Sequence, residues 1–322
     1  MDARLKKALK IILPLALGLF LIGYSYNMTS EEDRRIILKY IRQANPFWLI
    51  ISLLIGIFSH VSRAIRWNYL LEPMGYKPKL RNNILIILMA YLANLGIPRS
   101  GEFLRATALA TYEGVPFQKG FGTIVTERVV DLIMLFLVIL VALISQTDII
   151  LGYLSESGLG LGISIGLLVG GILGLFLLRA FLRRSSSPLA LKLRDFIRGL
   201  LEGITSIFKI RQRWAFLAHT LLIWGAYIAM FWVIKYTVAE TLSLSFGELL
   251  VAFVAGAFAM TATPGGLGLY PIAVAQALML FGISSNSGEA FGWIMWITQT
   301  LMVFVFGAIS FLLLPLWNRA DS

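Results

Sequence analysis

Residues 83–105 read NILIILMAYLANLGIPRSGEFLR, and this stretch decides the fold. Residues 83–97 are almost entirely apolar, but they are too few to cross a bilayer, because a spanning helix needs about 20 apolar residues. Pro98 lacks a backbone N–H and disfavours helix at the residue before it, so we expect the helix to break there. A second helix should restart with Ser100 as its N-cap. The pattern therefore predicts a broken helix pair rather than a transmembrane span.

The composition places this helix pair in a membrane protein. Of the 322 residues, 58% are hydrophobic and 14% are charged, and the mean hydropathy is +0.81. Soluble domains are about 45–50% apolar and about 25% charged. We therefore expect an all-α integral membrane protein. Six further segments are apolar and long enough to span: 8–26, 46–62, 129–145, 159–182, 214–234 and 291–316.

The net charge of +11 reports the orientation of the chain. Loops rich in Lys and Arg face the cytoplasm, so these residues indicate topology and contact with anionic lipid rather than a nucleic-acid partner. The basic segments, expected inside, are 1–10, 63–81 and 179–213. The segments without Lys or Arg, expected outside, are 146–158, 236–247 and 284–290. We place residues 27–45 outside as well, and both termini in the cytoplasm.

These side assignments constrain the short apolar segments. Residues 83–119 must enter from the cytoplasm and return, because one full span at 129–145 already accounts for the change of side. Residues 249–283, broken at Pro264-Gly265-Gly266, must likewise enter from outside and return. The prediction is about six full transmembrane helices and two oppositely oriented re-entrant hairpins in a single membrane domain, 1–322.

The order of elements in residues 1–146 recurs upside down in residues 159–317. This inverted repeat is inferred from topology alone, and inverted repeats with broken helices near the midplane are a recurrent transporter design. Residues 189–210 carry apolar side chains at i, i+3, i+4 and i+7, which predicts an amphipathic helix on the cytoplasmic surface. It would link the halves, or have a regulatory or partner-docking role.

Charged residues around the first break form the main candidate site. A charge deep in the membrane costs about 2.5–3.5 kcal/mol, so these groups are expected to pair. Three are arginines and three are acids, so the set can be neutral as a whole. It could hold an anionic group such as a lipid phosphate at the restarting helix, or it could only pin the hairpin to its neighbour. The residues are Arg99, Glu102, Arg105, Glu127, Arg128 and Asp131.

Two smaller features accompany this set. Arg63 and Arg66 are expected in a cytoplasmic belt at the end of a span, where they would either anchor the interface or guide headgroups toward the site. The second break exposes backbone amides and carbonyls that could handle a polar headgroup, or it is a tight turn packed for steric reasons. Its residues are Thr263, Pro264, Gly265, Gly266 and Gly268.

Catalytic chemistry has little support in the sequence. There is no cysteine, and the two histidines, His60 and His219, are isolated. We find no nucleotide-binding loop, no nucleophile–base pair, no redox motif and no metal-ligand spacing. We therefore expect no enzyme, no cofactor and no metal.

The motifs together resemble the flippase-like family, which is the membrane region of lysylphosphatidylglycerol synthase, the multiple peptide resistance factor. The resemblance covers roughly residues 10–315 and implies an integral protein of the plasma (inner) membrane of a bacterium or archaeon that moves lipids between leaflets. It also implies a polar core of Asn94, Glu102, Arg105, Glu127, Arg128 and Asp131. The matching motifs are Arg63–Trp67, Asn94, Pro98, Gly101-Glu102, Arg105, Glu127-Arg128 with Asp131, and Pro264-Gly-Gly-Leu-Gly268.

Two departures from the family pattern matter. The chain ends at Ser322 without a soluble aminoacyl-transfer domain, so we expect no synthase activity. The acidic residue that commonly follows the Pro-Gly-Gly-Leu-Gly motif is replaced here by Leu269-Tyr270-Pro271, which puts the role of that carboxylate in doubt.

The expected function is a lipid translocase that moves a phospholipid or lipid-linked headgroup through the polar core. Its partners would be membrane lipids with anionic or phosphate headgroups, and a homodimer is left open. The alternatives are a secondary transporter of a small polar or anionic solute and an intramembrane lipid-modifying enzyme.

Overall fold

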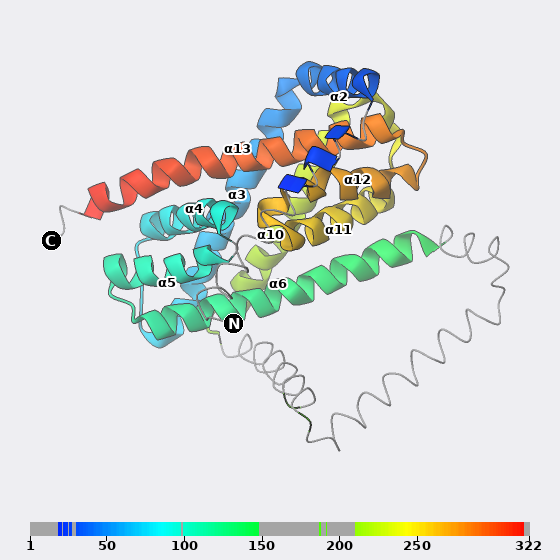
Figure 1. Cartoon of the computed structure of the whole chain (residues 1–322). Coiled ribbons are helices and arrows are strands. Elements are labelled where there is room, and N and C mark those ends of the chain that lie inside the picture. Colours follow the sequence, from blue (N-terminus) through cyan, green and yellow to red (C-terminus); the bar gives the residue numbers. More distant parts are fainter. Residues whose placement is uncertain are drawn as a thin grey trace.

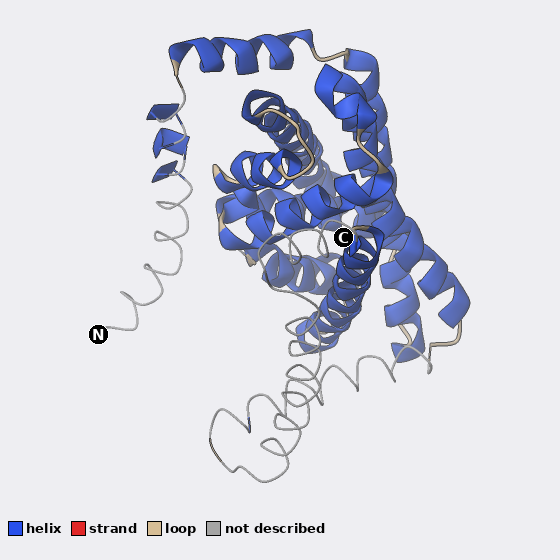
Figure 2. Cartoon of the chain, turned by 90° about the vertical axis from the view of Figure 1, so that its right-hand side faces the viewer, coloured by secondary structure: helices blue, strands red, loops and turns tan. Residues whose placement is uncertain are grey.

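The structure is a computed structural model that describes residues 19–20, 22–24, 26–27, 30–97, 99–147, 187, 191 and 210–318. Every regular element in these residues is a helix, and Figure 2 shows only helices and loops. The all-α prediction is therefore confirmed for the described part of the chain. The predicted span 159–182, nearly all of the amphipathic segment 189–210 and most of the segment 8–26 lie outside it.

Four helices in the described residues are long and apolar enough to cross a membrane. They coincide with four of the predicted spans. Each is longer than its apolar core, because the helix continues beyond the point where charged side chains begin. They are α3 (Pro46–Leu71), α6 (Phe117–Ser145), α10 (Arg213–Ile234) and α13 (Ser285–Asn318).

Four shorter helices form two pairs, each broken as the sequence predicts. The first pair is α4 (Leu80–Gly96) with α5 (Ser100–Glu113). The second is α11 (Phe246–Ala262) with α12 (Leu269–Met279), joined through the short η4 (Pro264–Gly266). Figure 1 shows the first pair on the left and the second on the right, between α13 above and α6 below.

Each pair begins and ends at one end of the bundle. The N–H of Lys79, just before α4, donates to the last residue of α5, Glu113, at 3.0 Å. The N–H of Ser284, just after α12, donates at 2.9 Å to Glu240 in η3 (Ala239–Ser243), shortly before α11. This hydrogen bond holds the pKa of the Glu240 carboxyl below its ordinary value.

Segments assigned to one side of the membrane lie together in the structure. At one end, α2 (Glu31–Gln43) reaches α13 through a 2.6 Å hydrogen bond from Asn286 to Asp33. At the other end, Gln212 donates to Glu72 at 3.3 Å and Asn82 donates to Asn318 at 2.9 Å. The charge pattern therefore sorted these segments into groups that share an end.

Helix packing relates the two parts of the chain. The central contact is α3 against α10, while α4 packs on α13 and α11 packs on α6. Exchanging α3 with α10, the first pair with the second, and α6 with α13 maps these contacts onto one another. The two parts are thus interlocked, since each short pair packs on the long helix of the other part.

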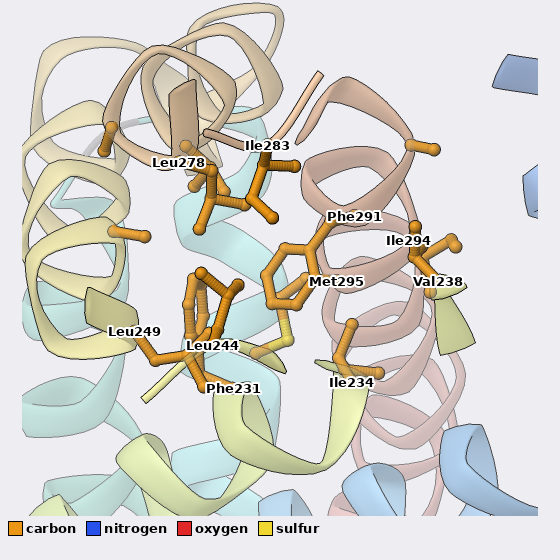
Figure 3. Packing of buried hydrophobic residues seen from close by; sticks show 14 of the residues in the cluster. Phe231, Ile234, Val238, Leu244, Leu249, Leu278, Ile283, Phe291, Ile294 and Met295 are labelled. Carbon is orange, nitrogen blue, oxygen red and sulfur yellow. The ribbon is translucent and has the colours of Figure 1, made fainter. Parts of the chain in front are cut away.

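An apolar cluster holds the second pair in place. Figure 3 shows Phe291 and Met295 of α13 beside Phe231 of α10, with Leu278 of α12 close by. The rings of Phe231 and Phe291 meet edge to face, with centroids 4.9 Å apart. The backbones of α12 and α13 also approach closely, because a Cβ on Gly292 would lie 2.6 Å from the Cα of Pro271.

We predict that Gly292→Ala destabilises the protein by about 1–3 kcal/mol, because the added methyl meets backbone that cannot shift cheaply. The measurement is the unfolding midpoint in detergent, followed by tryptophan fluorescence. Gly122→Ala in α6 is the matched control, since its Cβ would meet no atom within 4 Å. Equal midpoints for the two variants would contradict the close approach.

Candidate functional site

The α3 helix carries two arginines into the interior. Arg63, Arg66 and Trp67 lie on one helical face by their i, i+3, i+4 spacing, and all three are buried. The expectation that Arg63 and Arg66 form a cytoplasmic belt at a helix end is therefore wrong about their position. The helix runs on to Leu71, so both arginines face neighbouring helices instead of the interface.

Glu127 of α6 is the most enclosed acid of the site. Its side chain is 0% exposed and lies 2.6 Å from Arg105 of α5 and 3.3 Å from Arg66 of α3. One carboxylate thus joins three helices. Removing water from a charge costs several kcal/mol, so this arrangement depends on both arginines being in place.

Asp131 lies one helical turn beyond Glu127. It accepts from Arg63 at 2.8 Å and from Arg66 at 3.1 Å. Arg128 completes the set at its edge, 3.2 Å from Glu102 and 3.8 Å from Asp131. Its side chain is 43% exposed, which makes it the most accessible arginine of the network.

This connected set, here called the ion network, consists of Arg63, Arg66, Glu102, Arg105, Glu127, Arg128 and Asp131. Four arginines face three carboxylates, so the network carries a net charge of +1. The neutral set predicted from the sequence is wrong, because it lacked Arg63 and Arg66 and included Arg99. Arg99 is exposed and makes no ion pair with the described residues.

Neutral side chains complete the surroundings of the network. Arg66 donates to Thr220 at 3.2 Å and Arg63 donates to Tyr227 at 3.1 Å, both on α10. The guanidinium of Arg105 lies over the ring of Trp67 at 4.1 Å. Thr220 and Tyr227 were not predicted from the sequence. Their spacing of seven residues on one helical face is the only signal that could have suggested them.

The first break is closed by Asn94 rather than by Ser100. The side-chain oxygen of Asn94 accepts from the N–H of Gly101 at 2.8 Å, while the Ser100 hydroxyl donates back to Ala93 at 3.0 Å. Arg99 takes the cap position with a φ of 64°. Ser100 as N-cap was therefore wrong. A side chain on Gly101 would collide with the Ala90 carbonyl, so α4 and α5 are in close contact.

The second break meets the first. Gly265 adopts a φ of 57°, and its carbonyl accepts from the indole N–H of Trp296 at 2.7 Å. A Cβ on Gly265 would lie 2.8 Å from a methyl of Leu95, at the end of α4. Thr263, two residues before Gly265, is buried. Its hydroxyl has no hydrogen-bond partner among the described residues.

The predicted site residues thus fall into three places. Glu102, Arg105, Glu127, Arg128 and Asp131 join Arg63 and Arg66 in the ion network. Asn94 and Arg99 form the first break, and Arg99 is exposed there. The second break holds the remaining predicted residues, namely Thr263, Pro264, Gly265, Gly266 and Gly268.

The fold and the ion network define a helical integral membrane protein with paired charges buried between its helices. The sequence profile described as "Lysylphosphatidylglycerol synthase TM region" matches residues 11–307, so the chain belongs to this family. The family recognised from the motifs is therefore confirmed.

Three relatives match parts of the chain. A UPF0104 membrane protein of Methanocaldococcus jannaschii is 32% identical over 98 residues, 30% of this chain and 29% of that protein. The glycosyltransferase AglD of Haloferax volcanii is 28% identical over 107 residues, 33% of this chain and 17% of that protein. A UPF0104 membrane protein of Methanothermobacter thermautotrophicus is 25% identical over 123 residues, 38% of this chain and 33% of that protein. The matches thus span a third or less of each relative, and no solved structure matches significantly.

We predict that Glu127→Gln costs about 3–5 kcal/mol of stability, because the buried Arg105 loses its counter-charge and the buried Arg66 keeps only Asp131, without any change of side-chain volume. The midpoint of chemical unfolding in detergent measures the loss. Glu31→Gln is the control, since it breaks a 2.6 Å pair with Arg35 that is exposed on both sides. Exposed pairs contribute little, so comparable losses in the two variants would refute a buried network.

Proposed function

We propose that the protein is a lipid translocase that moves a phospholipid or a lipid-linked headgroup between leaflets. The observation that carries the proposal is the ion network, which connects α3, α5 and α6. The α4–α5 pair contributes to both features. Its α5 helix carries Glu102 and Arg105 of the network, and its α4 helix carries Leu95, which contacts the second break. Polar groups at such a place form a path for a headgroup, while the tails remain in the surrounding lipid.

Stability alone does not account for the network. A buried ion pair rarely stabilises a protein more than apolar residues of the same volume would, because desolvation offsets the attraction. Seven charged side chains inside a membrane protein therefore indicate a role in handling a polar substrate. The unpartnered hydroxyl of Thr263 is a further polar group available to such a substrate.

In this proposal the two helix pairs are re-entrant hairpins that dip into the membrane from opposite faces. The exchange of contacts between the two parts of the chain supports a repeat, which we propose is inverted, with about six full spans in one domain. Broken helices with a site near their breaks suit alternating exposure of that site to the two faces. Both termini would lie in the cytoplasm, on the side of the basic segments.

Substrate movement would be passive or ion-driven, because the sequence has no nucleotide-binding loop. Glu102 and Glu127 are the candidates for proton coupling, since they are carboxylates within the network. The protein would bind no cofactor and catalyse no covalent step. Its ligands would be membrane lipids with anionic or phosphate headgroups.

The test is reconstitution of the purified protein into liposomes that contain fluorescent lipids with different headgroups. We expect wild type to move lipid between leaflets with a dependence on the headgroup. Arg105→Ala should slow this movement about tenfold or more, because it removes the 2.6 Å partner of the buried Glu127 carboxylate and so disturbs the ion network. Arg213→Ala, at the exposed start of α10, is the control and should retain full activity.

Other outcomes select the alternatives. Uptake of a soluble anion without lipid movement would identify a solute transporter. One relative is named a glycosyltransferase, so a mass change of the lipid that depends on Glu127 would identify an enzyme. Equal lipid movement in wild type and Arg105→Ala would remove the ion network from the transport path.

A further inference from the structure

We infer that the Glu102–Arg128 pair is an exchangeable gate, at which the phosphodiester of a monoanionic lipid replaces the Glu102 carboxylate on Arg128. This inference rests on the proposed function and names the headgroup class and the two residues that select it. The other three arginines of the ion network would serve as fixed scaffold.

The three inner arginines are already committed to protein groups. Arg63, Arg66 and Arg105 have side chains at most 3% exposed, and each lies within 3.3 Å of a carboxylate. Two of them also bind α10, through Tyr227 and Thr220. A ligand could reach them only by separating the helices that they join.

Arg128 differs from them in its exposure. Its side chain is 43% exposed, and its two pairs are at 3.2 Å and 3.8 Å, so neither carboxylate holds it as closely as Glu127 holds Arg105. One oxygen of Glu102 is buried and has no hydrogen-bond partner in the described part of the chain. A carboxylate that makes a single contact with an exposed arginine and leaves its other oxygen unsatisfied is a weak partner, and a better acceptor can displace it.

The charge of the network selects the ligand. The network is one positive charge in excess, and the Nε–H groups of Arg63, Arg66 and Arg105 are buried donors without acceptors among the described residues. Those donors are enclosed and out of a ligand's reach, so the excess positive charge, acting across a medium of low dielectric, is what favours an added oxyanion at Arg128. One phosphodiester brings the sum to zero, whereas a zwitterionic headgroup leaves the excess and a cationic headgroup increases it.

The displaced carboxylate keeps a favourable position. Glu102 lies in the first turn of α5, where the partial positive charge of the helix N-terminus stabilises an anion, and its side chain is 17% exposed. The planar guanidinium of Arg128 meanwhile offers two parallel donors that match two phosphate oxygens. The exchange therefore replaces a single contact on Arg128 with a bidentate one.

The experiment measures equilibrium binding of short-chain phosphatidylglycerol to the full-length protein in detergent, by native mass spectrometry. We expect Arg128→Gln to weaken binding about tenfold or more, and Glu102→Gln to strengthen it about tenfold, because it removes the internal competitor. Arg213→Gln, at the exposed start of α10, is the matched control. Arg213 is an exposed arginine outside the ion network and outside both breaks, so this variant should bind like wild type.

The opposite changes in affinity expected for Arg128→Gln and Glu102→Gln decide the inference. A static structural pair predicts that both network variants weaken binding, and that result would overturn it. Equal losses in Arg213→Gln and Arg128→Gln would also overturn it, as would phosphatidylcholine binding as tightly as phosphatidylglycerol. If Arg128→Gln does not fold, Arg128→Lys replaces it and should lose affinity with its charge retained.

Two further arms separate the source of the anion and the proposed function. Inorganic phosphate is added as a competitor of phosphatidylglycerol. If it displaces the lipid at an equal concentration, the ligand is a soluble anion and the lipid assignment is overturned. The protein could bind phosphatidylglycerol selectively, more weakly in Arg128→Gln and more tightly in Glu102→Gln, yet move no lipid in liposomes. That result would support the exchange pair and contradict the translocase. Lipid movement in liposomes, with both variants binding phosphatidylglycerol more weakly, would support the translocase and contradict the exchange pair.

Discussion

The carboxylate of Glu127 must be paired, and the ion network is arranged around that requirement. It is fully enclosed, and its two arginines come from α3 and α5 while it belongs to α6. A single side chain therefore ties three helices at one depth. Arg66, once drawn in, also reaches Asp131, and Asp131 in turn holds Arg63. Each charge is tolerated because the previous one is present, so the group behaves as a unit rather than as separate pairs.

Much of this architecture was visible in the sequence, for identifiable reasons. Hydropathy located α3, α6, α10 and α13, and proline and glycine located both breaks, because these signals are local. The membership of the ion network was only partly visible. A hydropathy window ends where charges begin, so Arg63 and Arg66 were assigned to a belt at the end of a helix that in fact continues.

The local chemistry of the first break shows the same limit. Serine is a good N-cap by itself, yet Asn94 from the preceding helix caps α5 instead, since α4 and α5 pack closely at Gly101. The contributions of Thr220 and Tyr227 depend on α10 packing against α3, which no single segment encodes. Sequence patterns thus identified the charged residues better than their partners.

The contact between Leu95 and Gly265 has a mechanical meaning. Gly265 has no side chain, so Leu95 of the first helix pair presses directly on the backbone turn of the second. That turn is also held by Trp296 of α13. A displacement of the first break therefore moves the second break as well, because the two are in direct contact. In the proposed translocase, this contact would couple the movements of the two breaks.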